Sequence, residues 1–141
     1  MSKFIILKKR KDFLRAARDI TMVSKTVMIQ AARPLFEQSQ QPARIGFTAT
    51  KRLGKAHLRN RVKRRLRAVI RDVYASHTLK GVDYVLVGRY DTETCPFKDL
   101  RRDTIWALKK INKMIVSDET EQNCATESTV NHVQKNSDST D

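Results

Sequence analysis

Nine consecutive residues, Arg59-Asn60-Arg61-Val62-Lys63-Arg64-Arg65-Leu66-Arg67, hold six cationic side chains and no acidic one. Apolar residues run through this segment and beyond it at helical spacing: Leu58, Val62, Leu66, Val69, Ile70 and Val73. At about 100° per residue they occupy roughly a third of the helix circumference, which is typical of an amphipathic helix that faces a core. We therefore predict a helix whose cations are held in place by the fold.

The face opposite the apolar stripe carries Asn60, Arg64, Arg67 and Arg71, and the first acid on this helix is Asp72. A fixed cationic face without acids of its own predicts an anionic partner, and phosphates are the expected anions. Generic electrostatic binding or a nuclear-localisation-like run is the alternative. The stripe argues against it, because such runs do not need a packed face.

Charge is distributed unevenly along the chain. The net charge of the 141 residues is +14, but residues 117–141 hold six acids against one lysine, so residues 1–116 carry +19. Such an excess is larger than solubility requires and indicates a polyanionic partner. Residues 1–116 are predicted to form one RNA-binding domain. Residues 117–141 lose their apolar periodicity and are predicted to be a disordered acidic tail.

The predicted elements follow the order helix, strand, strand, helix, strand, helix. Clean alternation over residues 44–50 indicates a strand with one buried side, and the apolar centre Tyr84-Val85-Leu86-Val87 indicates an interior strand. The loop 33–43 is long enough to join two antiparallel strands in a hairpin. The fold class is therefore α+β, a small sandwich of a sheet and its helices. The remaining predicted elements are a helix at 8–20, a strand at 25–32 and a last helix that begins near Pro96.

Two aromatic residues leave alternatives open. Phe13 lies among cations on the first predicted helix, where it either stacks on an unpaired base or belongs to the core. Trp106 points away from the apolar stripe of the last helix (Phe97, Leu100, Thr104, Leu108, Ile111 and Ile115) and towards cations. It is a cation–π partner, an RNA contact or merely exposed.

The side chains do not resemble the active site of a protein enzyme. The histidines His57, His77 and His132 are isolated, and the acids are scattered, without metal-binding spacing. Cys95 and Cys124 match no disulfide or zinc framework and are interpreted as reduced thiols. We find no apolar run long enough for a signal peptide or a membrane span, so the expected location is cytoplasmic.

Two segments together carry a family resemblance. Residues 44–52, Arg-Ile-Gly-Phe-Thr-Ala-Thr-Lys-Arg, precede residues 54–64, Gly-Lys-Ala-His-Leu-Arg-Asn-Arg-Val-Lys-Arg. This pattern closely resembles the signature of the bacterial ribonuclease P protein subunit, an Arg-Asn-Arg helix after a strand that ends in paired basic residues. Residues 9–13 and 83–89 agree with the family pattern, and the similarity spans about residues 5–115.

The resemblance implies a fold like the second domain of ribosomal protein S5, with a left-handed strand–helix–strand crossover, against the usual handedness. It implies a subunit that binds a catalytic RNA and promotes removal of the 5′ leader from precursor tRNA. The RNA subunit uses Mg²⁺ for cleavage, and no catalytic or metal-binding residue is assigned to the protein. A general or ribosome-associated RNA-binding protein on the same fold is the alternative. A protein nuclease with its own metal site is disfavoured because the carboxylate cluster it would need is missing.

The resemblance also implies two sets of site residues. The RNA-subunit-binding set is Arg59, Asn60, Arg61, Lys63, Arg64 and Arg67. The leader-binding cleft is Phe13, Thr48, Thr50, Lys51, Arg52 and Arg89. Family members often carry an aromatic residue on the cleft face of the first strand, where this chain has Gln30. Leader affinity is then expected to depend more on Phe13 and the cations.

Overall fold

A computed structural model describes residues 4–35 and 40–131, with side chains described through residue 117. Its centre is a five-stranded sheet with the order β1-β4-β5-β3-β2. The central strand β5 (Asp83–Gly88) is flanked by β4 (Arg44–Thr48) and β3 (Val27–Ala32), and the edges are β1 (Ile5–Ile6) and β2 (Ile20–Val23). β1, β4 and β5 are parallel, whereas β3 is antiparallel to both β5 and β2.

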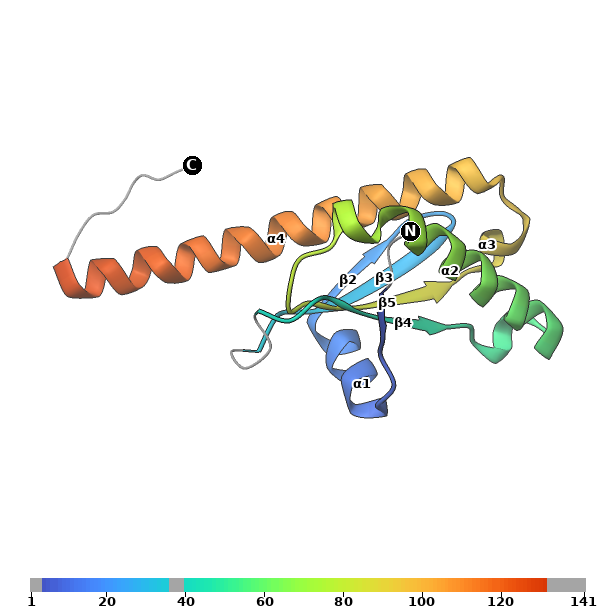
Figure 1. The fold of residues 1–141 in the computed structure, drawn as a ribbon, viewed down its shortest axis with the longest axis horizontal. Coiled ribbons are helices and arrows are strands. Elements are labelled where there is room, and N and C mark those ends of the chain that lie inside the picture. The colour runs from blue at the N-terminus through green and yellow to red at the C-terminus, as the bar shows by residue number, and fades with distance from the viewer. Residues whose placement is uncertain (1–3, 36–39, 132–141) are drawn as a thin grey trace.

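Helices lie on both faces of this sheet. The long helices α2 (Ala56–His77) and α4 (Phe97–Asn131) cover one face, and α1 (Arg10–Asp19) packs on the other (Figure 1). Short connecting helices follow β4 and β5, namely the 3₁₀ turn η2 (Lys51–Leu53) and α3 (Tyr90–Thr94). The α+β sandwich expected from the sequence is confirmed.

The main core lies between the sheet and the two long helices. The predicted stripe of α2 is buried from Val62 to Val73, and Leu58 at its start is half-buried. The predicted stripe of α4 is likewise buried from Leu100 to Ile115, while Phe97 keeps 39% of its surface exposed. Both long helices therefore form because their apolar periodicity matches the face that they bury.

A glycine lets α2 approach the end of β5 closely. A Cβ atom built on Gly88 would lie 2.3 Å from Cγ1 of Val62, well inside van der Waals contact. The Val62 side chain occupies the space that any other residue at position 88 would need. This contact positions the start of the basic helix against the carboxyl end of the central strand.

The predicted hairpin between residues 25–32 and 44–50 is wrong. β5 lies between β3 and β4, so these two strands are not neighbours. The actual hairpin joins β2 to β3 through a short turn in which Ser24 Oγ donates a hydrogen bond to the Val27 carbonyl (2.7 Å). Residues 21–23, which lie between the predicted helix at 8–20 and the predicted strand at 25–32, thus belong to an edge strand. The physical reason is that β5 is apolar on both sides, so a central position in the sheet buries the most apolar surface.

The boundary predicted after residue 116 falls within α4, which continues as helix to Asn131. Helical backbone at residues 117–131 differs from the disordered segment that the sequence predicts there. The expectation of disorder rested on the loss of apolar periodicity, which ends the packing of a helix without ending its backbone hydrogen bonds. Residues 132–141 of the predicted tail lie outside the described residues. No helix in the described ranges combines the length and apolarity needed to cross a membrane.

Candidate nucleic-acid interface

The predicted RNA-subunit-binding residues all lie on α2, on the sides that its apolar stripe leaves uncovered. Asn60, Arg61 and Arg64 are exposed, and Arg59, Lys63 and Arg67 are half-buried. Asn60, Arg64 and Arg67 recur at helical spacing and share one side of the helix, with Arg61 on the flank of that side. The structure therefore groups this set into one surface, which we call the α2 basic face.

Arg67 is held in place by an aromatic side chain. Its guanidinium carbon lies 5.3 Å from the ring centroid of Phe47 on β4, within the range of a cation–π interaction. Phe47 in turn makes an edge-on contact with Phe4, with ring centroids 5.9 Å apart. One end of the α2 basic face is thus packed against the aromatic side chains of β4 and the N-terminal segment.

α3 supplies further contacts that fix the face. Arg61 Nη1 donates to Glu93 Oε2 at 2.6 Å. Arg65 donates to the carbonyl oxygens of Glu93 (2.5 Å) and Cys95 (2.6 Å). The sequence predicts that the anions for these cations come from a partner, but Arg61 has one within the chain. Arg65 serves to hold α3 against α2.

Phe13 belongs to α1, and its ring lies over β4 on the face of the sheet that α1 covers. A Cβ atom built on Gly46 would lie 2.6 Å from Cε1 of Phe13, so the ring rests directly over this glycine. Phe13 is half-buried and packs against a small buried cluster formed by Leu7, Ala16, Ala32, Val85 and Val87. Phe13 therefore contributes to packing and keeps part of its ring accessible, and stacking on an unpaired base stays a prediction.

Strand alternation places the other cleft positions. Gly46 and Thr48 share the Phe13 face of β4, since Ile45 and Phe47 between them belong to the main core. Gln30 is half-buried on the same face of β3, because its neighbours Ile29 and Ala31 lie in that core as well. The expectation that Gln30 faces this side is confirmed.

The remaining predicted cleft residues gather where β4 and β5 end. Carboxyl ends of adjacent parallel strands meet at one edge of a sheet, and here they lead into Thr50, Lys51 and Arg52 from β4 and into Arg89 from β5. All four are exposed. The Tyr90 hydroxyl donates to the Arg52 carbonyl at 2.9 Å and so ties the two connections together. The structure thus forms a cationic edge beside the Phe13 face.

A buried ion cluster that the sequence analysis missed holds α1 against the sheet. Asp83, 1% exposed, accepts from Arg44 Nε (2.8 Å) and Nη2 (2.6 Å) and from Arg15 Nη2 (2.8 Å). Asp12 lies 3.6 Å from Arg44. The hydrogen bond from Arg44 to Asp83 raises the pKa of Arg44. The only sequence signal was an acid at the start of an apolar strand.

The described side chains include no group of three or more residues suited to hold a metal ion. His57 is exposed and His77 is half-buried at the end of α2. Burial raises the pKa of the half-buried Cys95 thiol, which disfavours a reactive thiolate. The side chain of Cys124 and all of His132 lie outside the described part. The described surface therefore offers a ligand cationic side chains and a partly accessible aromatic ring.

Comparisons with known proteins agree on one family. A family model described as "Ribonuclease P" matches residues 1–112. A protein from Ruegeria pomeroyi named "Ribonuclease P protein component" is 43% identical over 108 residues, which cover 76% of this chain and 86% of that protein. A protein of the same name from Gluconacetobacter diazotrophicus is 44% identical over 105 residues, covering 74% and 88%.

Solved structures share the fold. The Staphylococcus aureus RNase P protein at 2.0 angstrom superposes with a TM-score of 0.63 at 24% identity, covering 77% of this chain and 96% of that one. The Thermotoga maritima RNase P protein gives a TM-score of 0.62 at 24% identity, covering 74% and 94%. At this identity the structural likeness supports the fold, and the family assignment rests on the sequence matches.

Proposed function

This chain belongs to the ribonuclease P protein family, and from that premise we propose which of its surfaces holds which RNA. The family forms the protein component of a ribonucleoprotein endonuclease that matures the 5′ ends of tRNA. The catalytic RNA docks on the α2 basic face, and the 5′ leader of precursor tRNA lies along the Phe13 face of the sheet. Cleavage itself is assigned to Mg²⁺ held by the RNA subunit, and the site of action to the cytoplasm.

The observation that carries the docking proposal is the fixed geometry of the α2 basic face. Its helix is buried along one stripe, Arg67 stacks on Phe47, and Arg65 is bound to two carbonyl groups. A surface held this way loses little conformational entropy when it binds. The planar guanidinium groups of Arg61 and Arg64 suit paired contacts to phosphate oxygens.

The Phe13 face suits a single strand. It offers one partly accessible ring, polar groups at Thr48 and Gln30, and cations at the edge where β4 and β5 end. Bases stack on aromatic rings in a largely sequence-independent way, while cations follow the phosphates. Gln30 gives hydrogen bonding where an aromatic residue would give stacking, so Phe13 is the main stacking group of this face.

A cleavage assay tests the function as a whole. The full chain is added to the catalytic RNA and a precursor tRNA at low Mg²⁺ concentration, and release of the leader is measured. We expect the protein to accelerate the reaction and to be inactive alone. Activity without the RNA would contradict the proposal. A protein that binds both RNAs without changing the rate would instead favour the general RNA-binding alternative.

Replacing Phe13 tests the leader face. We expect Phe13→Leu, which keeps an apolar side chain over Gly46, to weaken binding of leader-bearing precursor tRNA by about 1–3 kcal/mol through lost stacking. Binding of mature tRNA by the same holoenzyme should stay unchanged, and so should assembly with the catalytic RNA. The matched control is Leu14→Ala, an exposed position of α1. Equal losses for precursor and mature tRNA would show that Phe13 acts only in packing.

A further inference from the structure

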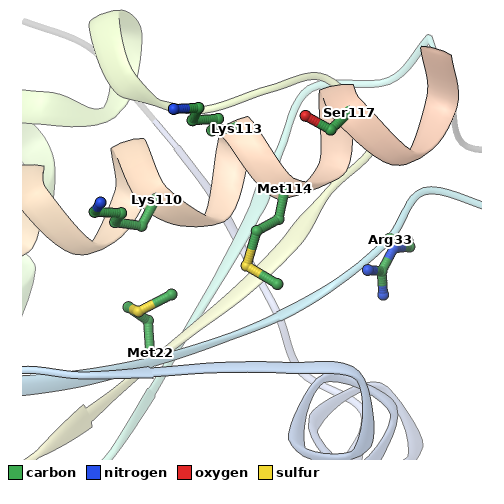
Figure 2. Close-up of a pocket in the computed structure, with 6 residues that line it drawn as sticks. All are labelled: Met22, Arg33, Lys110, Lys113, Met114 and Ser117. Carbon is green, nitrogen blue, oxygen red and sulfur yellow. The ribbon is translucent and has the colours of Figure 1, made fainter. Parts of the chain in front are cut away.

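A groove lies between the edge strand β2 and helix α4, away from both surfaces assigned above. It encloses about 350 Å³, within the roughly 300–1,000 Å³ range of small-ligand sites. Met22 points into it from β2, and Met114 points into it from α4 (Figure 2). The other lining residues are Arg33, Lys110, Lys113 and Ser117. The groove therefore combines an apolar, polarizable interior with a cationic rim.

Two of the rim cations have no acid to neutralise them among the described residues. Lys110 and Lys113 are exposed, and neither forms an ion pair there. Two acids with described side chains, one before β2 and one on α4, are already engaged. Asp19 pairs with Arg33, and Asp103 accepts from Thr26 Oγ1 (2.7 Å) and lies near Arg102. The described rim of the groove is therefore cationic, which favours an anionic ligand.

Trp106 lies on the same side of α4. It precedes Lys110 by four residues and Lys113 by seven, which places the three side chains on successive turns of one helix face. Trp106 keeps 43% of its surface exposed, and in the described part of the chain no cation stacks on it. The cation–π role left open by the sequence is therefore not supported. A flat aromatic surface remains beside unpaired lysines.

We propose that the groove between β2 and α4 is a third RNA-binding site, which takes an unpaired nucleotide of a single-stranded segment. The base contacts Met22 and Met114 in the groove, a neighbouring base stacks on Trp106, and the phosphates between them contact Lys110 and Lys113. Apolar, polarizable side chains and an accessible ring suit bases, and lysines spaced one turn apart follow a phosphate chain. The proposal does not depend on whether the partner of the α2 basic face is the catalytic RNA.

Tryptophan fluorescence measures binding at this site without an added label, because Trp106 is the only tryptophan of the chain. The probe is hexauridylate, which is single-stranded, titrated against the full-length protein while tryptophan fluorescence is recorded. We expect quenching that saturates. Lys110→Ala with Lys113→Ala should weaken the apparent affinity about tenfold and reduce the slope of log affinity against log salt by ~1.4, at ~0.7 per lost contact.

The reciprocal variant is Arg61→Ala with Arg64→Ala, which removes the same charge from the α2 basic face and should leave the quenching curve unchanged. Both lysines are exposed, so thermal unfolding of the lysine variant should match that of the unmodified protein. Quenching that is absent, or that survives the lysine substitutions, would overturn the proposal. So would equal quenching by hexaglutamate, which would identify an acidic protein surface as the ligand. Loss of stimulation in the cleavage assay alone would affect only the function proposed above.

Discussion

Replacing Asp83 with alanine is expected to lower the free energy of unfolding by about 3 kcal/mol. Removing one partner of a buried ion pair costs about 3–5 kcal/mol, because the other charge is left uncompensated. The lower end applies here, since the side chains of Arg15 and Arg44 keep 28% and 25% of their surface exposed and recover some hydration. Chemical denaturation of the full-length chain measures the change.

The matched control for Asp83 is Asp72→Ala. Asp72 also faces an arginine, Arg101, but at 3.8 Å and with 53% of its side chain exposed. Exposed pairs of this kind contribute about 0–1 kcal/mol, so we expect little change in the denaturation midpoint. Equal effects of the two substitutions would show that the buried cluster does not hold α1 against the sheet. Asp83→Ala should also weaken leader binding, because α1 carries Phe13.

Replacing Arg61 and Arg64 together with alanine is expected to weaken binding to the catalytic RNA at least tenfold, which corresponds to about 1.4 kcal/mol. Each lost phosphate contact should also reduce the slope of log affinity against log salt by up to ~0.9, with duplex DNA as the guide. Arg64 is exposed, so its full charge is available to phosphate. Arg61 must exchange Glu93 for phosphate, so its share should be the smaller one. Filter binding over a salt series measures both quantities.

The control for this pair is Lys25→Ala with Lys80→Ala. These exposed lysines lie in the turns before β3 and β5. Replacing both removes the same net charge as replacing the two arginines. A purely electrostatic attraction to the whole domain would make the two double variants equal, whereas docking on the α2 basic face makes the arginine variant much weaker. Neither variant should alter thermal unfolding, because all four substituted residues are exposed and lie outside the apolar stripe of α2.

The helices could be predicted from the sequence because their signals are local. The stripe from Val62 to Val73 and the stripe from Leu100 to Ile115 each determine which side of a helix is buried, and both predictions are confirmed. Strand pairing is a long-range property, and the predicted pairing of residues 25–32 with 44–50 is wrong. Nothing in residues 27–32 or 44–48 shows that a strand more than 30 residues later will enter between them.

The site shows the same division. The α2 basic face was predicted because six cations in nine residues stand out along the chain. The support behind it was missed, since Arg65, Glu93 and Phe47 meet only in three dimensions. The cluster around Asp83 joins residues from α1, β4 and β5, and residues 15 and 83 are far apart in sequence. Pairing of this kind needs the fold before it can be recognised.

The central position of β5 constrains the order in which this protein can be made. β5 is the last strand of the described residues, yet it separates β3 from β4 and supplies the carboxylate that binds Arg15 and Arg44. A nascent chain that has emerged only to residue 82 therefore exposes the open edges of both strands, and it has neither a finished sheet nor an anchored α1. The Phe13 face and the position of α2 therefore both need β5 in place, because this strand completes the sheet from its middle.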